Sequence, residues 1–326
     1  MLQLDGVSAR YNVLDGYVNA VDNINFTIEK DEIFGIAGES GCGKSTLLKV
    51  MYDLIGYPLE LSQGRIRIQQ EDDTYVDSGD IHKVWWKLIS YVPQGAMHVM
   101  NPVRRVESQF FDTINNKYHK KMSKKEAREK IGSYLQDLEL SPDLLRAYPH
   151  QLSGGMRQRV LIALATFLNP RVILADEPTT ALDVVVQRDI LGMLMSVQKK
   201  MGNSMVIVSH DMGVHYQVTK RMGIMYAGQM IEIGPTDEIF NNPQHPYTQM
   251  LIGALPKVGD NSQKEGIPGT PPNLKNPPDG CRFAARCKYA NDECRKIQPE
   301  TVQVGDNHFA ACLRCGQGKG GSEYGV

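Results

Sequence analysis

The chain has 326 residues and a formal net charge of −1, with 41% hydrophobic and 22% charged residues. This length accommodates one large domain with an appendage, or two modest domains. The balanced charge gives no electrostatic reason to expect nucleic-acid binding. No apolar run approaches the roughly 18 residues that a membrane span requires, and the N-terminus does not look like a signal peptide. We therefore expect a cytosolic protein that reaches a membrane only through a partner.

The first strong pattern is GESGCGKST at residues 38–46, which satisfies the phosphate-loop pattern G-x-x-x-x-G-K-[ST]. The apolar run 33–37 predicts a buried strand before it, and residues 46–51 predict a helix after it. Glycines let backbone N–H groups close around phosphate oxygens, and a helix N-terminus adds a favourable dipole. We predict a nucleotide site in which Lys44 reaches the β- and γ-phosphates and Ser45 binds Mg²⁺; a chance match is the alternative. The nucleotide-binding residues predicted here are Gly38, Ser40, Gly41, Cys42, Gly43, Lys44, Ser45 and Thr46.

Two helices are predicted further along the chain. Ser123 and Glu126 form a capping box at the start of the first, which continues with apolar residues at helical spacing. The second is an apolar helix over 160–168 that opens with Ser153, Gly154 and Gly155. Such an N-terminus suits an anion, and a plain helix cap is the alternative.

Two apolar runs then predict buried strands with polar residues at their ends. The first, 172–175, leads into Asp176 and Glu177, and the second, 206–208, leads into His210. Ligands bind at such strand ends in parallel sheets. We predict that Asp176 holds Mg²⁺ and that Glu177 acts as general base on the attacking water. An acidic helix cap is the alternative for the carboxylate pair.

These motifs, in this order, resemble the ATPases of ABC transporters, because SGG at 153–155 and LADEP at 174–178 match their signatures. The resemblance covers about residues 1–255. It implies an α/β fold, a P-loop ABC ATPase with a RecA-like core, an antiparallel β subdomain and a helical subdomain at about 95–160. It also implies a role for Gln94 in the Q-loop, Asp183 in the D-loop, and Tyr11 as the ring that stacks on adenine. His210 is the implied switch histidine. A surface glutamine, a helix cap, a core histidine and an ordinary half-buried tyrosine are the respective alternatives.

The same resemblance implies a mechanism. Two ATPase subunits bind head to tail and sandwich two ATP molecules, with Ser153, Gly154 and Gly155 of one reaching the γ-phosphate held by the other. Hydrolysis then separates the subunits. The implied catalytic residues are Lys44, Gln94, Glu177 and His210, and the implied Mg²⁺ ligands are Ser45, Gln94 and Asp176.

The region from 256 to 326 is predicted to be a separate tail. Residues 266–278 contain five prolines and indicate an irregular linker. Five of the six cysteines follow, and their spacing is not a common zinc pattern. Disulfides are disfavoured in the cytosol, while structural zinc and free thiols remain open.

This tail resembles that of peptide-type importer ATPases, the oligopeptide and dipeptide permease group. GCRFAARC at 280–287 and HPYT at 245–248 carry the resemblance. It implies a [4Fe–4S] cluster, for which thiolate ligation is chemically reasonable. HFAAC at 308–312 favours Cys312 over Cys315 as the fourth ligand. The implied cluster ligands are Cys281, Cys287, Cys294 and Cys312.

The partners follow from the same resemblance. It implies two transmembrane permease subunits, an extracytoplasmic solute-binding protein and a second, paralogous ABC ATPase, at the cytoplasmic face of the membrane. Residues 94–101 are the expected contact with a permease helix. The expected cargo is an oligopeptide, a dipeptide or an oligosaccharide. Relatives with this tail also import nickel or opines, so the resemblance does not name the cargo. The alternative is a soluble ABC ATPase acting on nucleic acid or ribosomes, which the charge balance does not favour.

Overall fold

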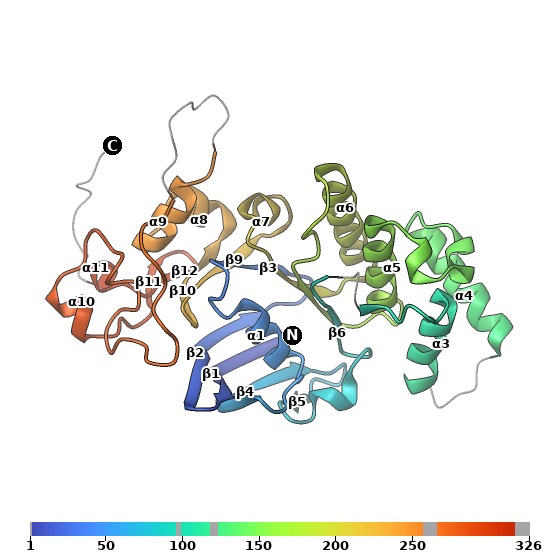
Figure 1. Cartoon of the computed structure of the whole chain (residues 1–326), viewed down its shortest axis with the longest axis horizontal. Helices are drawn as coiled ribbons and strands as arrows, with labels where there is room; N and C mark the ends of the chain where they lie inside the picture. Colours follow the sequence, from blue (N-terminus) through green and yellow to red (C-terminus); the bar gives the residue numbers. More distant parts are fainter. Residues whose placement is uncertain (1, 96–98, 118–122, 257–265, 317–326) are drawn as a thin grey trace.

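The computed structural model describes residues 2–95, 99–117, 123–256 and 266–316, which form two β-sheets with helices around them. Figure 1 shows α3 (Val106–Lys117) and α4 (Lys124–Asp137) at one end of the molecule and the C-terminal region at the other. Within the described ranges, no helix is both long and apolar enough to cross a bilayer.

In the described part of the chain, the larger sheet has eight strands, and β3, β6, β7 and β8 run parallel to one another. Strands β7 and β8 are buried along their whole length, as expected where helices cover both faces of a parallel sheet. Strand β9 also pairs in parallel with β3, so the carboxyl ends of these five strands meet at one edge. In spatial order the strands are β11 (Val302–Gly305), β12 (His308–Ala310), β10 (Gln229–Pro235), β9 (Arg221–Tyr226), β3 (Ile33–Ala37), β8 (Ser204–Val208), β7 (Val172–Asp176) and β6 (Ile89–Val92).

The smaller sheet is antiparallel and packs against the first helix of the core. Phe34 of β3 and Leu47 and Leu48 of α1 (Lys44–Met51) share one hydrophobic cluster with its buried side chains. This packing fixes the helix that follows the phosphate loop. Among the described residues, its strands in spatial order are β2 (Gly16–Ile28), β1 (Leu2–Val13), β4 (Leu59–Gln69) and β5 (Tyr75–Asp77).

The capping box predicted at Ser123 and Glu126 is confirmed at the start of α4. Together with α3 and α5 (Gly154–Thr166), α4 contributes to a hydrophobic cluster that also includes residues of β7. The described chain also has three short 3-10 helices, at Ile81–Val84, Pro142–Arg146 and Pro149–Gln151. Its remaining α-helices with defined bounds are α6 (Val184–Met201), α7 (Met212–Val218), α8 (Thr236–Asn241), α9 (Pro246–Gly253), α10 (Asp292–Lys296) and α11 (Leu313–Gly316).

The C-terminal region, described over residues 266–316, is joined to the core more closely than a linked tail would be. Strand β12 pairs with β10, placing Ala310 opposite Glu232 and Phe309 opposite Ile233, and β11 pairs with β12. The core sheet therefore continues into the residues after 300, which the sequence analysis did not predict. The boundary near residue 256 stays a prediction about domains.

Candidate functional site

The phosphate loop connects β3 to α1 and has a backbone that only glycine accommodates at two positions. Gly38 and Gly43 have φ angles of 150° and 107°. A Cβ atom at Gly38 would lie 2.1 Å from the carbonyl oxygen of Met225, and one at Gly43 would lie 2.1 Å from that of Ala20. Because both neighbours are backbone atoms, they cannot rotate away. The loop is thus held tightly by the strands beside it.

Lys44 opens α1 and is folded back onto the loop. Its Nζ donates to the carbonyl oxygens of Gly38 at 2.8 Å and Glu39 at 2.9 Å. The residue is 5% exposed, so its positive charge lies inside the loop. An anion at the N-terminus of α1 would meet this ammonium group and the free N–H groups of the first helical turn.

Asp176 ends β7 and lies beside Ser45. Its two carboxylate oxygens accept hydrogen bonds from Ser45 Oγ and Tyr91 Oη, each at 2.9 Å. Burial raises the pKa of this carboxyl above its ordinary value, and the bonds from Tyr91 and Ser45 partly offset that effect. A buried carboxylate next to a hydroxyl is the oxygen-donor pair that Mg²⁺ favours. The two residues therefore fit the predicted magnesium site.

Glu177 follows Asp176 and gathers the other predicted catalytic side chains. Gln94 Nε2 donates to its Oε2 at 2.9 Å, Thr180 Oγ1 donates to the same oxygen at 2.7 Å, and His210 Nδ1 lies 3.3 Å from Oε1. The side chain of Gln94 is therefore hydrogen-bonded to Glu177, with Nε2 turned toward the carboxylate. Burial raises the pKa of Glu177, but hydrogen bonds from Thr180 and His210 and nearby positive charge outweigh it, so that the pKa is lowered. The carboxylate is ionised and able to accept a proton.

Tyr11 of β1 is connected to the same site by its contact with Thr46. Its hydroxyl is 3.2 Å from Thr46 Oγ1. Tyr17, the neighbouring tyrosine, is 44% exposed, and the guanidinium of Arg10 covers its ring at 3.7 Å from the centroid. Of the two rings, Tyr11 is the one connected to the phosphate loop.

The signature residues and Asp183 form a second surface. Ser153 caps α5 by accepting from Met156 N at 3.3 Å, and Asp183 caps α6 by accepting from Val186 N at 3.0 Å. The two segments touch, because a Cβ atom at Gly155 would lie 2.5 Å from Val186. The helix caps named as alternatives in the sequence analysis are therefore present at both positions. In the described structure neither cap residue is hydrogen-bonded to the cluster around Glu177.

Comparison with known proteins agrees with this geometry. The family model for ABC transporters matches residues 21–180, and the one for the oligopeptide/dipeptide transporter C-terminal region matches residues 231–294. The dipeptide transport ATP-binding protein DppD of Bacillus subtilis is 40% identical over 96% of this chain and 94% of its own. The chain belongs to the ABC-transporter ATP-binding subunits of the oligopeptide/dipeptide family.

Further relatives fit this assignment. The oligopeptide transport ATP-binding protein OppD of Bacillus subtilis is 36% identical over 95% of this chain and 87% of its own. The solved dimeric structure of the ABC transporter cassette MJ0796 superposes with a TM-score of 0.63 at 29% identity, covering 72% of this chain and 99% of that one. The predicted ABC ATPase fold is thereby confirmed, and the chain is an ATP-hydrolysing enzyme.

Four of the six cysteines of this ABC subunit line one pocket. It is small and largely apolar, and Phe283 and Leu313 line it with the cysteines. Cys315 does not line it. Across the described ranges, no group of three or more His, Cys, Asp or Glu side chains is placed to hold a metal ion. The predicted metal therefore stays a proposal. The cysteines lining the pocket are Cys281, Cys287, Cys294 and Cys312.

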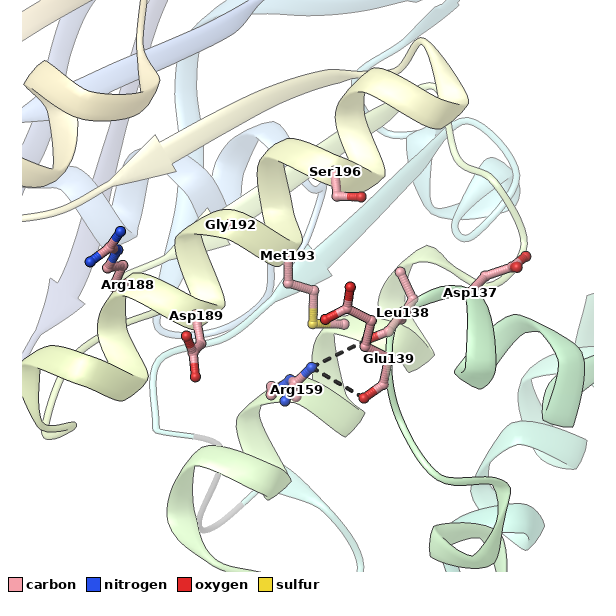
Figure 2. A pocket seen from close by; sticks show the side chains of 9 residues that line it. All are labelled: Asp137, Leu138, Glu139, Arg159, Arg188, Asp189, Gly192, Met193 and Ser196. Atoms are coloured by element: carbon pink, nitrogen blue, oxygen red, sulfur yellow. Dashed lines mark hydrogen bonds between the residues drawn. The ribbon is translucent and has the colours of Figure 1, made fainter.

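A separate surface pocket lies between α5, α6 and the end of α4 (Figure 2). Arg159 lines this pocket and donates to the carbonyl oxygens of Leu138 at 3.2 Å and Glu139 at 3.5 Å. Met193 of α6 points toward Arg159 in the same view. None of the predicted nucleotide or metal residues lines this pocket.

The sequence analysis missed three residues that contact the site. Tyr91 and Thr180 hold the two carboxylates, and Arg286 of the C-terminal region forms an ion pair with Glu39 in the phosphate loop. Tyr91 lies only three residues before Gln94, but no predicted element includes it. No sequence signal connects Arg286 with Glu39, because 247 positions separate them.

Proposed function

We propose that this chain closes against a second, paralogous ABC ATPase around two ATP molecules and reopens on hydrolysis, and that this cycle drives import of short peptides. The observation that carries the proposal is the cluster around Glu177, in which Gln94, Thr180 and His210 contact one ionised carboxylate. Within it, Glu177 takes the proton of the attacking water, and His210 and Gln94 orient that carboxylate. Lys44 stabilises the charge that develops on the transferring phosphoryl group. Mg²⁺, held by Ser45 and Asp176, would supply charge neutralisation at the phosphates.

The dimer is supported by the surface around the signature. Val184 and Val185 are 79% and 71% exposed beside Asp183, and Met156 is 38% exposed beside Gly155. Large apolar side chains gathered at an exposed surface are typical of an interaction site. The related MJ0796 cassette is described as dimeric. In the proposed dimer, Ser153, Gly154 and Gly155 face the nucleotide of the partner.

The proposed contact with the permease is the segment 94–101. Residues 96–98 lie outside the described residues, while Gln94 is exposed and Val99 is 44% exposed. Val103, just beyond, is 80% exposed. These side chains suit an apolar contact with a permease helix, and they adjoin the glutamine that bonds Glu177. We therefore place the chain peripherally at the cytoplasmic face of the membrane, with two permease subunits and an extracytoplasmic solute-binding protein.

The cargo is proposed to be dipeptides or oligopeptides rather than oligosaccharides, because the relatives named above are peptide transport proteins. The test is reconstitution of the chain with its permease subunits in liposomes, with ATP hydrolysis measured as loaded binding protein is added. Peptides should stimulate hydrolysis and accumulate in the vesicles, and oligosaccharides should do neither. A transporter carrying Glu177→Gln is the matched control without hydrolysis. Purification with RNA or DNA in place of permease subunits would favour the soluble alternative.

We also propose a [4Fe–4S] cluster on the four cysteines of the C-terminal pocket. Four thiols and no carboxylate line this apolar pocket, which is the donor set such clusters use. A single zinc ion needs its thiolates at about 2.3 Å from one point, whereas a cubane cluster accepts thiolates that stand further apart. When bound, the cluster would cross-link segments of the C-terminal region that are distant in sequence.

Anaerobic purification followed by iron, sulfide and zinc analysis tests this proposal. We expect about four irons and four sulfides per chain. Cys287→Ser should lose them, and Cys315→Ser, the matched control, should keep them because Cys315 does not line the pocket. One zinc without iron, or full iron content in Cys287→Ser, would rule out the proposed cluster.

A further inference from the structure

The C-terminal region anchors the phosphate loop at Glu39. The backbone N–H of Glu39 donates to the hydroxyl of Tyr247 at 3.0 Å. Its carboxylate accepts two parallel bonds from Arg286, from Nη1 to Oε2 at 2.9 Å and from Nη2 to Oε1 at 3.0 Å. Such bidentate pairs fix geometry as well as charge. One residue of the loop is thus held at two points by residues more than 200 positions away.

Arg286 is buried and is held by several hydrogen bonds. Its side chain is only 5% exposed, against 24% for that of Glu39. Besides Glu39 it donates to the hydroxyl of Tyr226 at 3.2 Å, and to the carbonyl oxygens of Pro268 at 2.7 Å and Ile267 at 3.2 Å. A buried guanidinium with this many acceptors has one conformation open to it. It therefore acts as a rigid support.

An aromatic cluster of Tyr226, Tyr247 and Phe283 holds the support against the core. All three side chains are at most 1% exposed, and their ring centroids are 4.7 to 5.4 Å apart. The guanidinium of Arg286 lies 5.7 Å from the Tyr226 centroid and 5.9 Å from that of Phe283. Because Tyr226 ends β9 and Phe283 belongs to the C-terminal region, this packing joins Arg286 to the core sheet.

Glu39 places a negative charge in the phosphate loop. It lies next to Gly38, in a loop whose task is to bind phosphates, and its carbonyl oxygen accepts from Lys44 Nζ at 2.9 Å. An uncompensated carboxylate here would repel the phosphates and compete for Lys44. Arg286 neutralises that carboxylate and leaves the ammonium group of Lys44 available to the nucleotide.

We propose that Arg286 is a positioning residue of the nucleotide site, through which the C-terminal region holds the phosphate loop and offsets the negative charge of Glu39. Arg286 touches Glu39 and not the reacting atoms. Its loss should therefore weaken nucleotide binding more than it slows the chemical step.

The test measures Mg-ATP affinity by titration calorimetry, and KM and kcat for ATP, in the full chain. Arg286→Met keeps the packing on the aromatic rings and removes the charge. We expect its affinity for Mg-ATP to fall by about fivefold or more, with kcat within about twofold of wild type. Arg286→Lys keeps the charge but not the paired bonds, and should fall between. Glu39→Gln combined with Arg286→Met should recover most of the affinity, because no uncompensated carboxylate is left.

A second arginine–glutamate pair provides the matched control. Arg221 Nη1 lies 2.9 Å from Glu32 Oε1, just before the opposite end of β3. Arg221→Met removes a comparable ion pair without touching the loop, so it should leave Mg-ATP affinity unchanged. Wild-type affinity in folded Arg286→Met, an equal loss in Arg221→Met, or no recovery in the double variant would each overturn the proposal. If Arg286→Met does not fold, Arg286→Lys is compared with wild type and with Arg221→Met. The proposal is then overturned if Arg286→Lys binds Mg-ATP as tightly as wild type and adding Glu39→Gln to it brings no gain in affinity.

Discussion

At the residue scale, the decisive feature is the single carboxylate of Glu177, held by three polar side chains. Its φ of 45° is in the left-handed region, which is uncommon for a residue other than glycine. The strained backbone turns the side chain of Glu177 toward Gln94 and His210, while Asp176 immediately before it bonds Ser45. Two adjacent carboxylates thus serve two different partners, with pKa values shifted in opposite directions.

Replacing this residue gives the first prediction. Glu177→Gln keeps the size and the hydrogen-bonding capacity of the side chain but cannot accept the proton of water. We expect steady-state ATP turnover to fall by about a hundredfold or more, with Mg-ATP still bound and the closed dimer accumulating. Turnover assays together with size-exclusion chromatography in ATP measure both effects. Wild-type turnover in this variant would remove Glu177 from the role of base.

The motif residues could be predicted from the sequence because the phosphate loop and the strand ends are local patterns. Tyr91 could not be placed in the same way, since its role depends on the register between β6 and β7. Tyr91 lies opposite Leu174 in that register, and from there its hydroxyl reaches Asp176. Spacing within one segment does not contain that information.

At the scale of elements, two helices of the core depend on buried neutral histidines. His245 caps α9, and its Nδ1 accepts from Tyr247 N at 3.0 Å. His215 of α7 lies under β3, with Nε2 3.1 Å from the carbonyl oxygen of Ser209. Burial lowers the pKa of each to about 4, and for His245 the nearby Glu232 opposes this shift. Both rings are therefore neutral in the folded chain at neutral pH.

These histidines predict a loss of stability in mild acid. The unfolded chain takes up a proton at each histidine below about pH 6.5, while the folded chain does so only near pH 4. The free energy of unfolding should therefore fall as the pH is lowered through this window, by about 2 kcal/mol for each histidine between pH 7 and pH 5. His245→Asn keeps an N-cap residue and removes one titrating group, so its loss between these pH values should be smaller by about that amount. Urea unfolding at the two pH values measures this. An unchanged pH dependence would contradict it.

At the same scale, the short strands β11 and β12 were not predicted from the sequence. They have four and three residues, and β11 alternates between half-buried and exposed positions. So short a pattern does not stand out from irregular chain. Their pairing is decided by the open edge of β10, which is more than 60 positions earlier in the sequence.

At the scale of the whole molecule, the C-terminal region contacts the nucleotide-binding core at several points. It completes the core sheet through β12, buries Phe283 against the core, and reaches the phosphate loop through Arg286. The sequence analysis predicted a linked tail, since the proline-rich stretch and the cysteines suggested a self-contained segment. The boundary near residue 256 stays a prediction, whereas these long-range contacts could not be predicted from composition.

A truncated chain tests this view. Residues 1–255 alone would leave the edge of β10 unpaired and Tyr226 and Tyr247 without Phe283. We expect this truncation to associate with itself as its concentration rises, because an unpaired edge and exposed aromatic rings both favour association. Analytical ultracentrifugation measures it, and a chain ending at residue 316 is the control for shortening. A monodisperse truncation with the thermal stability of the longer chain would contradict the expectation.

The pairing of β10 with β12 also has a consequence for how the chain is made. A ribosome releases β10 some 70 residues before β12, and chains emerge N-terminus first at about 5–20 residues per second. For several seconds, the phosphate loop, both carboxylates and the switch histidine exist in a nascent protein whose sheet has an open edge. During that time the edge of β10 is unpaired and open to association with other chains. Arg286, which holds Glu39 of the phosphate loop, is added only when most of the chain has been translated.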